Sequence, residues 1–388
     1  MRFLVGADYS SDPNSGAGGT VFHSIRALRE IGCEVDEFWR ADLGRRIQHG
    51  NLHYWLELPR AFRRVVAGRC AKKSYDVVLL SQPHAYLAGQ YVRRHHPQTL
   101  FLNRSHGWEG AVDELMDRLT AANPRPVSPF RSWLHHQMRN RLARHQDRVV
   151  EVSDGMVVGS ALIARLLNER YAYPMEKIGV IPHGIYGDYL ATDLPPARAD
   201  RWKKILYVGQ YTLIKAPEQV ARVLNAVLSR RPNVFAGWVC DRTHHDEVRR
   251  LLDPRVQERV ALHPWMGQDD LKAVFDDYGL FLFPSWYEGC AKAPVEAMSR
   301  GLAVVSSRIG GPADRIRHGI NGFLFDPGAA DAMAAQLEAL LDDPALAQRI
   351  GMQARHDVMD ITWTNHARQL VTFAERLRKE KREESART

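Results

Sequence analysis

Short apolar runs alternate with stretches of helical hydrophobic spacing along almost the whole chain. Runs of four to eight apolar residues bounded by turn residues indicate strands, and longer stretches with a period near 3.6 indicate helices. In the first half, strands are predicted at 2–7, 34–39, 76–81, 99–103, 149–152, 156–159 and 178–181. Helices are predicted between them at 19–31, 85–95, 132–146 and 160–170. This alternation predicts a parallel sheet covered by helices.

A second series of the same kind begins near residue 205. Its strands are predicted at 205–208, 234–240, 259–263, 280–283, 303–306 and 323–325, and its helices at 217–230, 244–252, 269–277, 330–341 and 344–354. The segment 186–203 separates the two series, and its Pro195, Pro196 and alternating charges predict a linker. We therefore expect two doubly wound α/β domains, with a ligand in the cleft between them at the carboxyl ends of the strands.

Composition fits two soluble globular domains. The chain has 388 residues, of which 45% are hydrophobic and 25% are charged, which is enough for two cores. No apolar run approaches the roughly 20 residues of a membrane span, and the first strand leaves no room for a signal peptide. The four cysteines lie far apart, without disulfide or metal-site spacing. We expect a reduced, cytoplasmic protein.

Positive charge is concentrated in the first half. Residues 1–190 hold 25 Lys and Arg against 19 Asp and Glu, which accounts for most of the net charge of +8. This excess is suited to an anionic membrane surface, an anionic acceptor or nucleic acid, or it is only solvated arginine. Nucleic acid is the least favoured partner, because the interleaved aromatic and basic residues of single-strand binders are missing.

One basic segment, 59–73, has helical spacing of Phe62, Val65, Val66 and Cys70 on one side. Cations populate much of the rest. Such a helix either lies on an anionic membrane, at the inner face of the cell membrane, or buries its apolar stripe in the domain core. The spacing alone leaves both interpretations open.

The most informative segment follows the apolar strand 280–283. A turn holds Glu288, and a helix predicted to begin near Pro294 carries Glu296. The free amides and positive dipole of that helix end, with the flexible Gly289, form a seat for an anion. Two carboxylates flank the seat and can accept hydrogen bonds from sugar hydroxyls. A ligand with phosphates in the middle and a sugar at each end is a nucleotide sugar.

The spacing of Glu288 and Glu296, with the following strand 302–307, the Gly310-Gly311 turn and the stretch 321–327, resembles the retaining glycosyltransferases of the GT-B fold, family 4. The resemblance implies two Rossmann-like domains that face each other across a cleft. The acceptor-side domain would be 1–185, completed by a C-terminal helix within 364–388. The domain for the nucleotide-sugar donor would be 186–363.

The resemblance also implies site residues. Those for donor binding are Gly16, Gly18, Gly209, Gln210, Lys215, Trp265, Gly289, Cys290, Ala291, Lys292 and Glu296, and those for catalysis are His106, Lys215 and Glu288. The family has an arginine where this chain has Gln210, so a bidentate phosphate contact is lost. We hypothesise that Lys292 replaces that cation, and a solvent-facing lysine is the alternative.

Other positions keep two interpretations. Gly16 and Gly18 open the first helix, either as a loop for donor phosphates or as a dinucleotide site that lacks the third glycine, since Val21 stands there. His106 follows a strand and either lies near the donor sugar or is satisfied by local backbone. Trp265 either stacks on the nucleobase or belongs to the core.

The reaction expected from the resemblance needs neither metal nor cofactor. No Asp-x-Asp or clustered His/Cys spacing occurs near these motifs. Lys215 and loop amides would instead stabilise the departing diphosphate of a UDP- or GDP-sugar. The acceptor would be a glycan, a glycolipid or a small molecule. A sugar phosphorylase, a nucleotide-sugar epimerase and a non-catalytic binding protein remain the rival functions.

Overall fold

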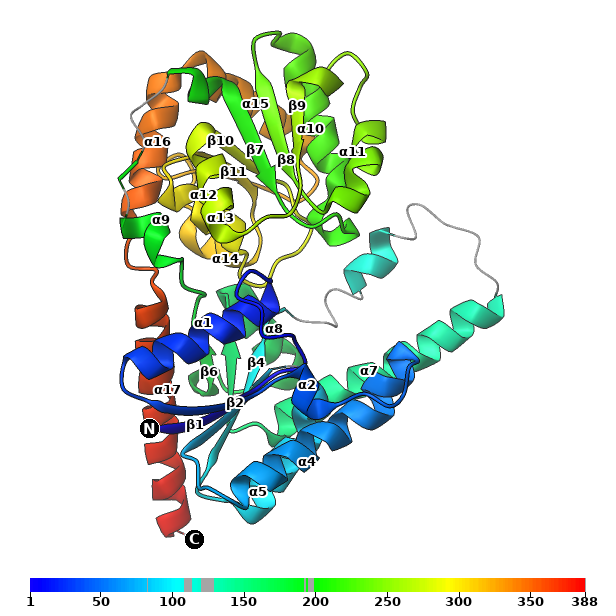
Figure 1. Ribbon diagram of the computed structural model, residues 1–388, viewed down its shortest axis with the longest axis vertical. Coiled ribbons are helices and arrows are strands. Elements are labelled where there is room, and N and C mark those ends of the chain that lie inside the picture. The colour runs from blue at the N-terminus through cyan, green and yellow to red at the C-terminus, as the bar shows by residue number, and fades with distance from the viewer. Residues whose placement is uncertain (82, 108–113, 120–128, 192, 195–198, 388) are drawn as a thin grey trace. The chain divides into compact units, whose positions relative to one another are not determined.

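The computed structural model describes residues 1–387 except 82, 108–113, 120–128, 192 and 195–198. The chain divides into two compact units (Figure 1). The first unit contains Met1–Pro182 and Trp363–Thr388, and the second contains His183–Thr362. The predicted boundary after residue 185 lies three residues beyond the observed one after Pro182. The predicted boundary after residue 363 lies one residue beyond the observed one after Thr362.

The described residues of the first unit form a parallel sheet with strand order β2-β1-β3-β4-β5-β6. Its strands are β1 (Arg2–Gly6), β2 (Glu34–Phe38), β3 (Val77–Ser81), β4 (Leu100–Ser105), β5 (Gly155–Val158) and β6 (Ile178–Val180). Central strands are apolar on both sides, because helices cover both faces of a parallel sheet. All residues of β3 and β4 are buried, as this arrangement requires.

Two sets of helices cover that sheet. Helices α1 (Ala17–Glu30) and α17 (Trp363–Arg387) pack on one face, where Ile25 and Leu370 meet Leu102 of β4. Helices α4 (Leu58–Cys70), α5 (Tyr86–His95) and α7 (Pro129–Val152) share the other core, with Phe101 of β4. Other helices of this unit are α2 (Arg40–Leu43), α3 (Gly50–Leu52), the π-helical turn η1 (His53–Glu57), η2 (Pro83–Ala85), α8 (Ala161–Tyr171) and η3 (Met175–Lys177), and residues 114–119 are also helical.

The strand predicted at 149–152 is wrong, because these residues form the last turn of α7. Val149 is fully buried in the core that α7 shares with α4 and α5. A short apolar run cannot by itself distinguish a buried strand from the buried end of a helix.

Most of the basic segment 59–73 forms helix α4, which ends at Cys70, and the apolar side of this helix packs against other residues of the first unit. Phe62, Val66 and Cys70 are buried in the core with Phe101. The stripe therefore packs inside the first unit, as the second of the two interpretations predicts. No described helix is both long enough and apolar enough to cross a membrane.

The C-terminal helix is held along its length. Phe373 and Leu377 are buried, and their side chains lie where a Cβ on Gly155 would collide, 2.5 Å from Leu377 Cδ1 and 3.2 Å from Phe373 Cζ. The mixed charges of 378–384 predict a tail that frays in solvent; in the structure 382–384 are helical and exposed, and the helix has a partner at least as far as Lys381. Lys381 lies 2.7 Å from Asp154, an ion pair with a residue more than 200 positions away in the sequence.

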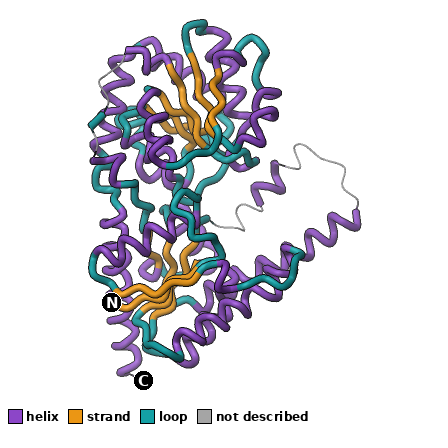
Figure 2. The backbone as a smooth tube through the Cα atoms, viewed as in Figure 1, coloured by secondary structure: helices purple, strands orange, loops and turns teal. Residues whose placement is uncertain are grey.

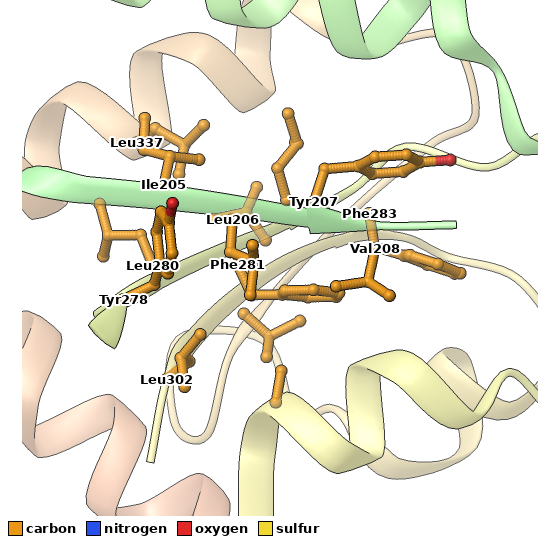
Figure 3. Packing of buried hydrophobic residues seen from close by; sticks show 14 of the residues in the cluster. Ile205, Leu206, Tyr207, Val208, Tyr278, Leu280, Phe281, Phe283, Leu302 and Leu337 are labelled. Atoms are coloured by element: carbon orange, nitrogen blue, oxygen red, sulfur yellow. The ribbon is translucent and has the colours of Figure 1, made fainter. Parts of the chain in front are cut away.

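The second unit contains another parallel sheet, with described strands in the order β12-β11-β10-β7-β8-β9. They are β7 (Lys204–Val208), β8 (Phe235–Val239), β9 (Val260–His263), β10 (Leu280–Phe283), β11 (Ala303–Ser307) and β12 (Phe323–Phe325). Figure 2 shows the sheet, in orange, between its helices. Leu337 lies on one side of the strands and Leu302 on the other, so both faces of the sheet are apolar (Figure 3).

Helices surround this second sheet, and most lie where the hydrophobic spacing predicts them. They are α10 (Pro217–Arg230), α11 (His245–Leu251), α12 (Gln268–Asp277), α13 (Lys292–Ser299), α14 (Gly310–Arg315), α15 (Ala330–Asp342) and α16 (Pro344–His356), with the short turns η5 (Leu213–Lys215), η6 (Arg242–His244) and η7 (Gln257–Arg259).

The segment 186–203 is part of the second unit, so the predicted linker is wrong. It contains helix α9 (Gly187–Ala191) and the turn η4 (Ala199–Lys203), and Pro195 and Pro196 lie outside the described residues. Tyr189 is 1% exposed and Trp202 is 7% exposed, and both belong to the core of this unit. The linker was predicted from the prolines and alternating charges of this segment, and that pattern gave no indication that Tyr189 and Trp202 are buried.

Candidate active site

The loop 284–291 connects β10 to α13 and carries the predicted donor-site residues Glu288 to Ala291. Helix α13 begins at Lys292, two residues before the predicted start at Pro294. Proline is equally suited to this position, because amides throughout a first helical turn have no intrahelical partner. Ala291 precedes the helix with φ 54° and ψ 106°, a left-handed conformation that costs energy for a residue with a Cβ.

Lys215 and Glu288 form the central ion pair of this site. Lys215 Nζ lies 2.6 Å from Glu288 Oε1, and the Glu288 side chain is 7% exposed. The ammonium group also lies 5.7 Å from the centre of the Phe283 ring. A largely buried pair of this kind is screened less by salt than a surface pair.

Backbone contacts hold the two loops that carry this pair together. The Trp286 amide donates to the Ile214 carbonyl at 2.8 Å, and the Tyr207 hydroxyl donates to the Lys215 carbonyl at 3.3 Å. Lys215 is thereby fixed at the carboxyl ends of β7 and β10, the edge at which parallel α/β sheets bind ligands.

Glu296 is a buried carboxylate in the second turn of α13. It is 4% exposed, and its side chain has no hydrogen bond to any other residue that the structure describes. Burial raises the pKa of Glu296, and the charge of Lys292 opposes that shift. A buried acceptor without a protein donor costs free energy, so this carboxyl group is suited to a ligand that supplies hydroxyl donors.

Two glycines at the start of α14 allow the loop to take its path. A Cβ on Gly311 would lie 1.7 Å from the Cys290 carbonyl oxygen, and one on Gly310 would lie 2.1 Å from that of Glu288. Any side chain at either position would push the loop away from α14. The Gly310-Gly311 pair therefore determines where Glu288 and the following amides lie.

Cys290 is buried and supports the loop from behind. Its sulfur accepts a hydrogen bond from the His183 amide at 3.4 Å, and burial raises the pKa of its thiol. This contact joins the loop to the first residue of the second unit.

The other donor-site residues predicted in this unit occupy different environments. A Cβ on Gly209 would lie 2.5 Å from the Tyr207 hydroxyl oxygen, so a close approach requires glycine there. Gln210 is exposed just after β7. Lys292 is half-buried, with Nζ 5.9 Å from the centre of the Tyr186 ring. Trp265 is 43% exposed, which argues against a core residue.

Gly16, Gly18 and His106 belong to the first unit. A Cβ on Gly18 would lie 2.6 Å from Ser15 Oγ, whereas one on Gly16 would meet no atom within 4 Å. The close packing of the turn thus requires glycine at position 18, whereas the space beside Gly16 is open to a side chain. The His106 ring follows β4 and meets the Tyr9 ring edge-on, with the centroids 5.7 Å apart.

A cavity lies beside His106, at the carboxyl ends of the strands of the first sheet. The sequence motifs did not predict it. Its lining residues are Tyr9, Pro83, Asn103, Arg104, Ser105, His106 and Gln146. The sequence feature that could have indicated this cavity is Arg104, because a charged residue within a buried strand of a parallel sheet is uncommon.

Part of the chain is similar to a known family. Residues 195–357 match the sequence model of the glycosyl transferases group 1, a stretch that contains Lys215, Glu288 and Glu296. D-inositol 3-phosphate glycosyltransferase of Corynebacterium aurimucosum is 25% identical over 407 residues, covering 92% of this chain and 91% of that protein. The chain spans little more than half the length, 56% and 57%, of two further relatives of that name.

Solved structures of glycosyltransferases and a sucrose-phosphate synthase have the same fold. Sucrose-phosphate synthase from Thermosynechococcus elongatus aligns over 97% of this chain and 99% of its own, with a TM-score of 0.73 and 22% identity. Anabaena HepE in complex with UDP-glucose aligns over 95% of this chain and 98% of its own, with a TM-score of 0.67 and 15% identity. The predicted α/β class is confirmed, and the fold is GT-B.

Proposed function

We propose that this protein is a glycosyltransferase of group 1, a retaining, metal-independent enzyme that transfers a sugar from a nucleotide diphosphate to a hydroxyl acceptor. The observation that carries the proposal is the buried Glu296 carboxyl group, which has no partner among the described side chains, on the helix that follows the Lys215–Glu288 pair. The two hydroxyls of a ribose would supply the missing donors. The diphosphate would then lie toward Lys215.

The charges around the loop support this donor. Lys215 would bind the diphosphate, and Lys292 would supply a second cation where the family's arginine is replaced by Gln210. Amides 289–291 would contact the phosphate and the sugar. Trp265, exposed after β9, would stack on the base. The HepE structures with UDP and UDP-glucose favour a UDP-sugar as the first donor to test.

Transfer would proceed through an oxocarbenium-like transition state. The bond between the anomeric carbon and the phosphate oxygen breaks, and its electron pair leaves with the diphosphate. Lys215 stabilises that growing charge. The acceptor oxygen attacks the face that the diphosphate leaves, and the acceptor proton passes to a phosphate oxygen. His106 would lie beside the sugar.

No step of this scheme calls for a metal ion. Among the described residues, no three His, Cys, Asp or Glu side chains gather closely enough to hold one. The positive charge that a metal would supply to the leaving group would come from Lys215 and from the amides at the start of α13.

The acceptor would be a glycan, a glycolipid or a small molecule, and the reaction would occur in the cytoplasm. The Corynebacterium relative is named for inositol 3-phosphate, and a neighbour is named sucrose-phosphate synthase. Both names favour a small polar acceptor as the first to test. The burial of the apolar side of α4 removes the main argument for membrane contact.

Calorimetry with a panel of UDP- and GDP-sugars tests the donor assignment. Wild type should bind one donor, and Glu296→Gln should lose at least about tenfold in affinity, because a hydrogen bond to a charged group is worth about 1.5–3 kcal/mol. Glu258→Gln, an exposed residue of the same unit, is the matched control. Equal affinity in all three proteins would refute the donor site.

Analysis of the products separates the rival functions. A glycosyltransferase releases the nucleoside diphosphate in proportion to glycosylated acceptor. A phosphorylase would form sugar phosphate from inorganic phosphate, and an epimerase would convert the donor without an acceptor. Either of those products in place of transfer would overturn the proposal.

A further inference from the structure

We propose that the cavity of the first unit binds an oxyanion, a phosphate or carboxylate group, through the buried guanidinium of Arg104. The cavity is a small, partly open hollow at the carboxyl ends of the strands, with about 230 Å³ of empty space when the adjoining solvent is included. Arg104 lies near the end of β4, two residues before His106. The proposal rests on the proposed function in one respect, because it assigns the anion to the acceptor.

Arg104 is buried with part of its hydrogen-bonding capacity unused. The residue is 3% exposed. Its Nη2 donates to Ser24 Oγ at 2.9 Å and lies 3.4 Å from His366 Nε2. Its Nε and Nη1 have no partner among the residues that the structure describes. A guanidinium can donate five hydrogen bonds in a fixed planar arrangement, so the single Nε hydrogen and the two Nη1 hydrogens remain available.

No residue that the structure describes neutralises the charge of Arg104. No carboxylate of the described chain lies within ion-pair distance of it. Burial lowers its pKa to about 10, so the group is still a cation at neutral pH. An uncompensated buried charge is costly, and proteins usually pair such a group or use it to bind a ligand.

The neighbouring histidine does not supply an opposite charge. His366 Nδ1 lies 2.6 Å from the Pro182 carbonyl oxygen, so this nitrogen carries the proton and Nε2 is an acceptor. Burial and the charge of Arg104 lower the pKa of His366 to about 3, so the ring is neutral. His366 and Ser24 therefore orient the guanidinium and leave its charge intact.

The rest of the cavity lining is suited to the same ligand. The other polar residues are Tyr9, Asn103, Ser105, His106 and Gln146, which are neutral or titratable hydrogen-bonding groups, and none of the described lining residues is acidic. One fixed cation among neutral polar groups favours a single oxyanion, since hydrogen bonds from a charged donor to an anionic oxygen are about twice as strong as those between neutral groups. In the proposed reaction, the acceptor would therefore carry a phosphate or a carboxylate.

Anion binding is tested in a Lys215→Ala background, so that the diphosphate site does not contribute. The melting temperature is measured against sodium phosphate, sodium acetate and sodium chloride at matched ionic strength. We expect phosphate or acetate to raise it above the chloride value. The more effective anion identifies the group that the cavity prefers. No rise with either anion would overturn the proposal.

Substitution of Arg104 tests whether the rise in melting temperature comes from anion binding to this residue. In the same background, Arg104→Met should weaken the binding of the effective anion at least about tenfold. Arg94→Met, which removes an exposed arginine from the same unit, should leave binding unchanged. Binding that survives Arg104→Met, or that is lost equally in Arg94→Met, would overturn the proposal.

The melting temperature without added anion separates this role from a purely structural one. Removal of an unpaired buried charge should leave stability equal or higher. If Arg104 only braced α1 and α17, Arg104→Met would melt earlier and keep its response to anions. If Arg104→Met does not fold, Arg104→Gln and Arg104→Lys are measured, and only the lysine variant should retain binding. The test needs neither donor nor turnover, so its result is independent of the nucleotide-sugar assignment.

Discussion

Lys215 Nζ lies 2.6 Å from Glu288 Oε1, and this ion pair joins the loop after β7 to the loop after β10. Glu288 thus holds the lysine in place and shares its positive charge. A donor diphosphate that approaches Lys215 would take part of that charge. The ion pair therefore couples the position of Glu288 to occupation of the phosphate site.

Lys215→Ala should reduce turnover more than donor affinity. Negative charge on the diphosphate grows as the glycosidic bond breaks, so the contact is strongest in the transition state. Loss of one such electrostatic group typically lowers kcat by about 100-fold or more. Nucleotide release measured under saturating donor checks this. The exposed Lys203→Ala should behave as wild type, and near-normal turnover in Lys215→Ala would show that the phosphate binds elsewhere.

Glu296→Gln should alter the pH dependence of stability. The folded-state pKa of Glu296 is raised by burial, above the value of about 4.3 expected in the unfolded chain. The unfolded state therefore releases this proton first, and the contribution of Glu296 to stability falls as pH rises from about 4.3 through the folded pKa.

Denaturant unfolding across that pH range measures the difference. The free energy of unfolding of wild type, relative to Glu296→Gln, should decline with rising pH and then level off. A difference that is constant with pH would mean that the carboxyl group is solvated. Saturating donor should oppose the decline, because ribose hydroxyls would hydrogen-bond to the ionised form.

Gly311→Ala should displace the carboxylate loop. The added Cβ would lie 1.7 Å from the Cys290 carbonyl oxygen, so either the loop or α14 must move. Overpacking of this kind typically costs about 1–3 kcal/mol of stability, and donor affinity should fall with it. Gly187→Ala is the matched control, since its Cβ would meet no atom within 4 Å. Wild-type affinity in Gly311→Ala would mean that the loop position does not matter for binding.

EDTA should leave the proposed transfer reaction intact. Lys215 and the amides of α13 would supply the positive charge at the leaving group. Activity is compared before and after chelation, and again after Mg²⁺ or Mn²⁺ is added. Activity that disappears with chelator and returns with metal would contradict the metal-independent scheme.

The two sheets were predictable because central strands of parallel sheets are apolar on both faces. The run 280–283 has this character and is β10. The same reasoning failed at 149–152, where a buried helix end has the same composition. It failed again at 186–203, where Tyr189 and Trp202 are separated by polar residues and prolines.

Motif spacing singled out Lys215 and Glu288 as candidate site residues. They are 73 positions apart, and the structure brings them into contact, which the spacing did not predict. Arg104 could not be interpreted in this way. Arg104 is a candidate ligand-binding residue because some of its N–H groups have no described hydrogen-bond acceptor. That can be seen only when the structure shows Ser24 and His366 as its neighbours.

The return of α17 to the first sheet has a consequence for synthesis of the chain. Residues 183–362 are contiguous, so the second unit can complete its core as soon as it leaves the ribosome. The first unit emerges earlier but must wait for Phe373 and Leu377, which cover Gly155. The half of the protein that is made first is therefore the half that matures last, and until then β5 exposes an apolar surface that a chaperone could recognise.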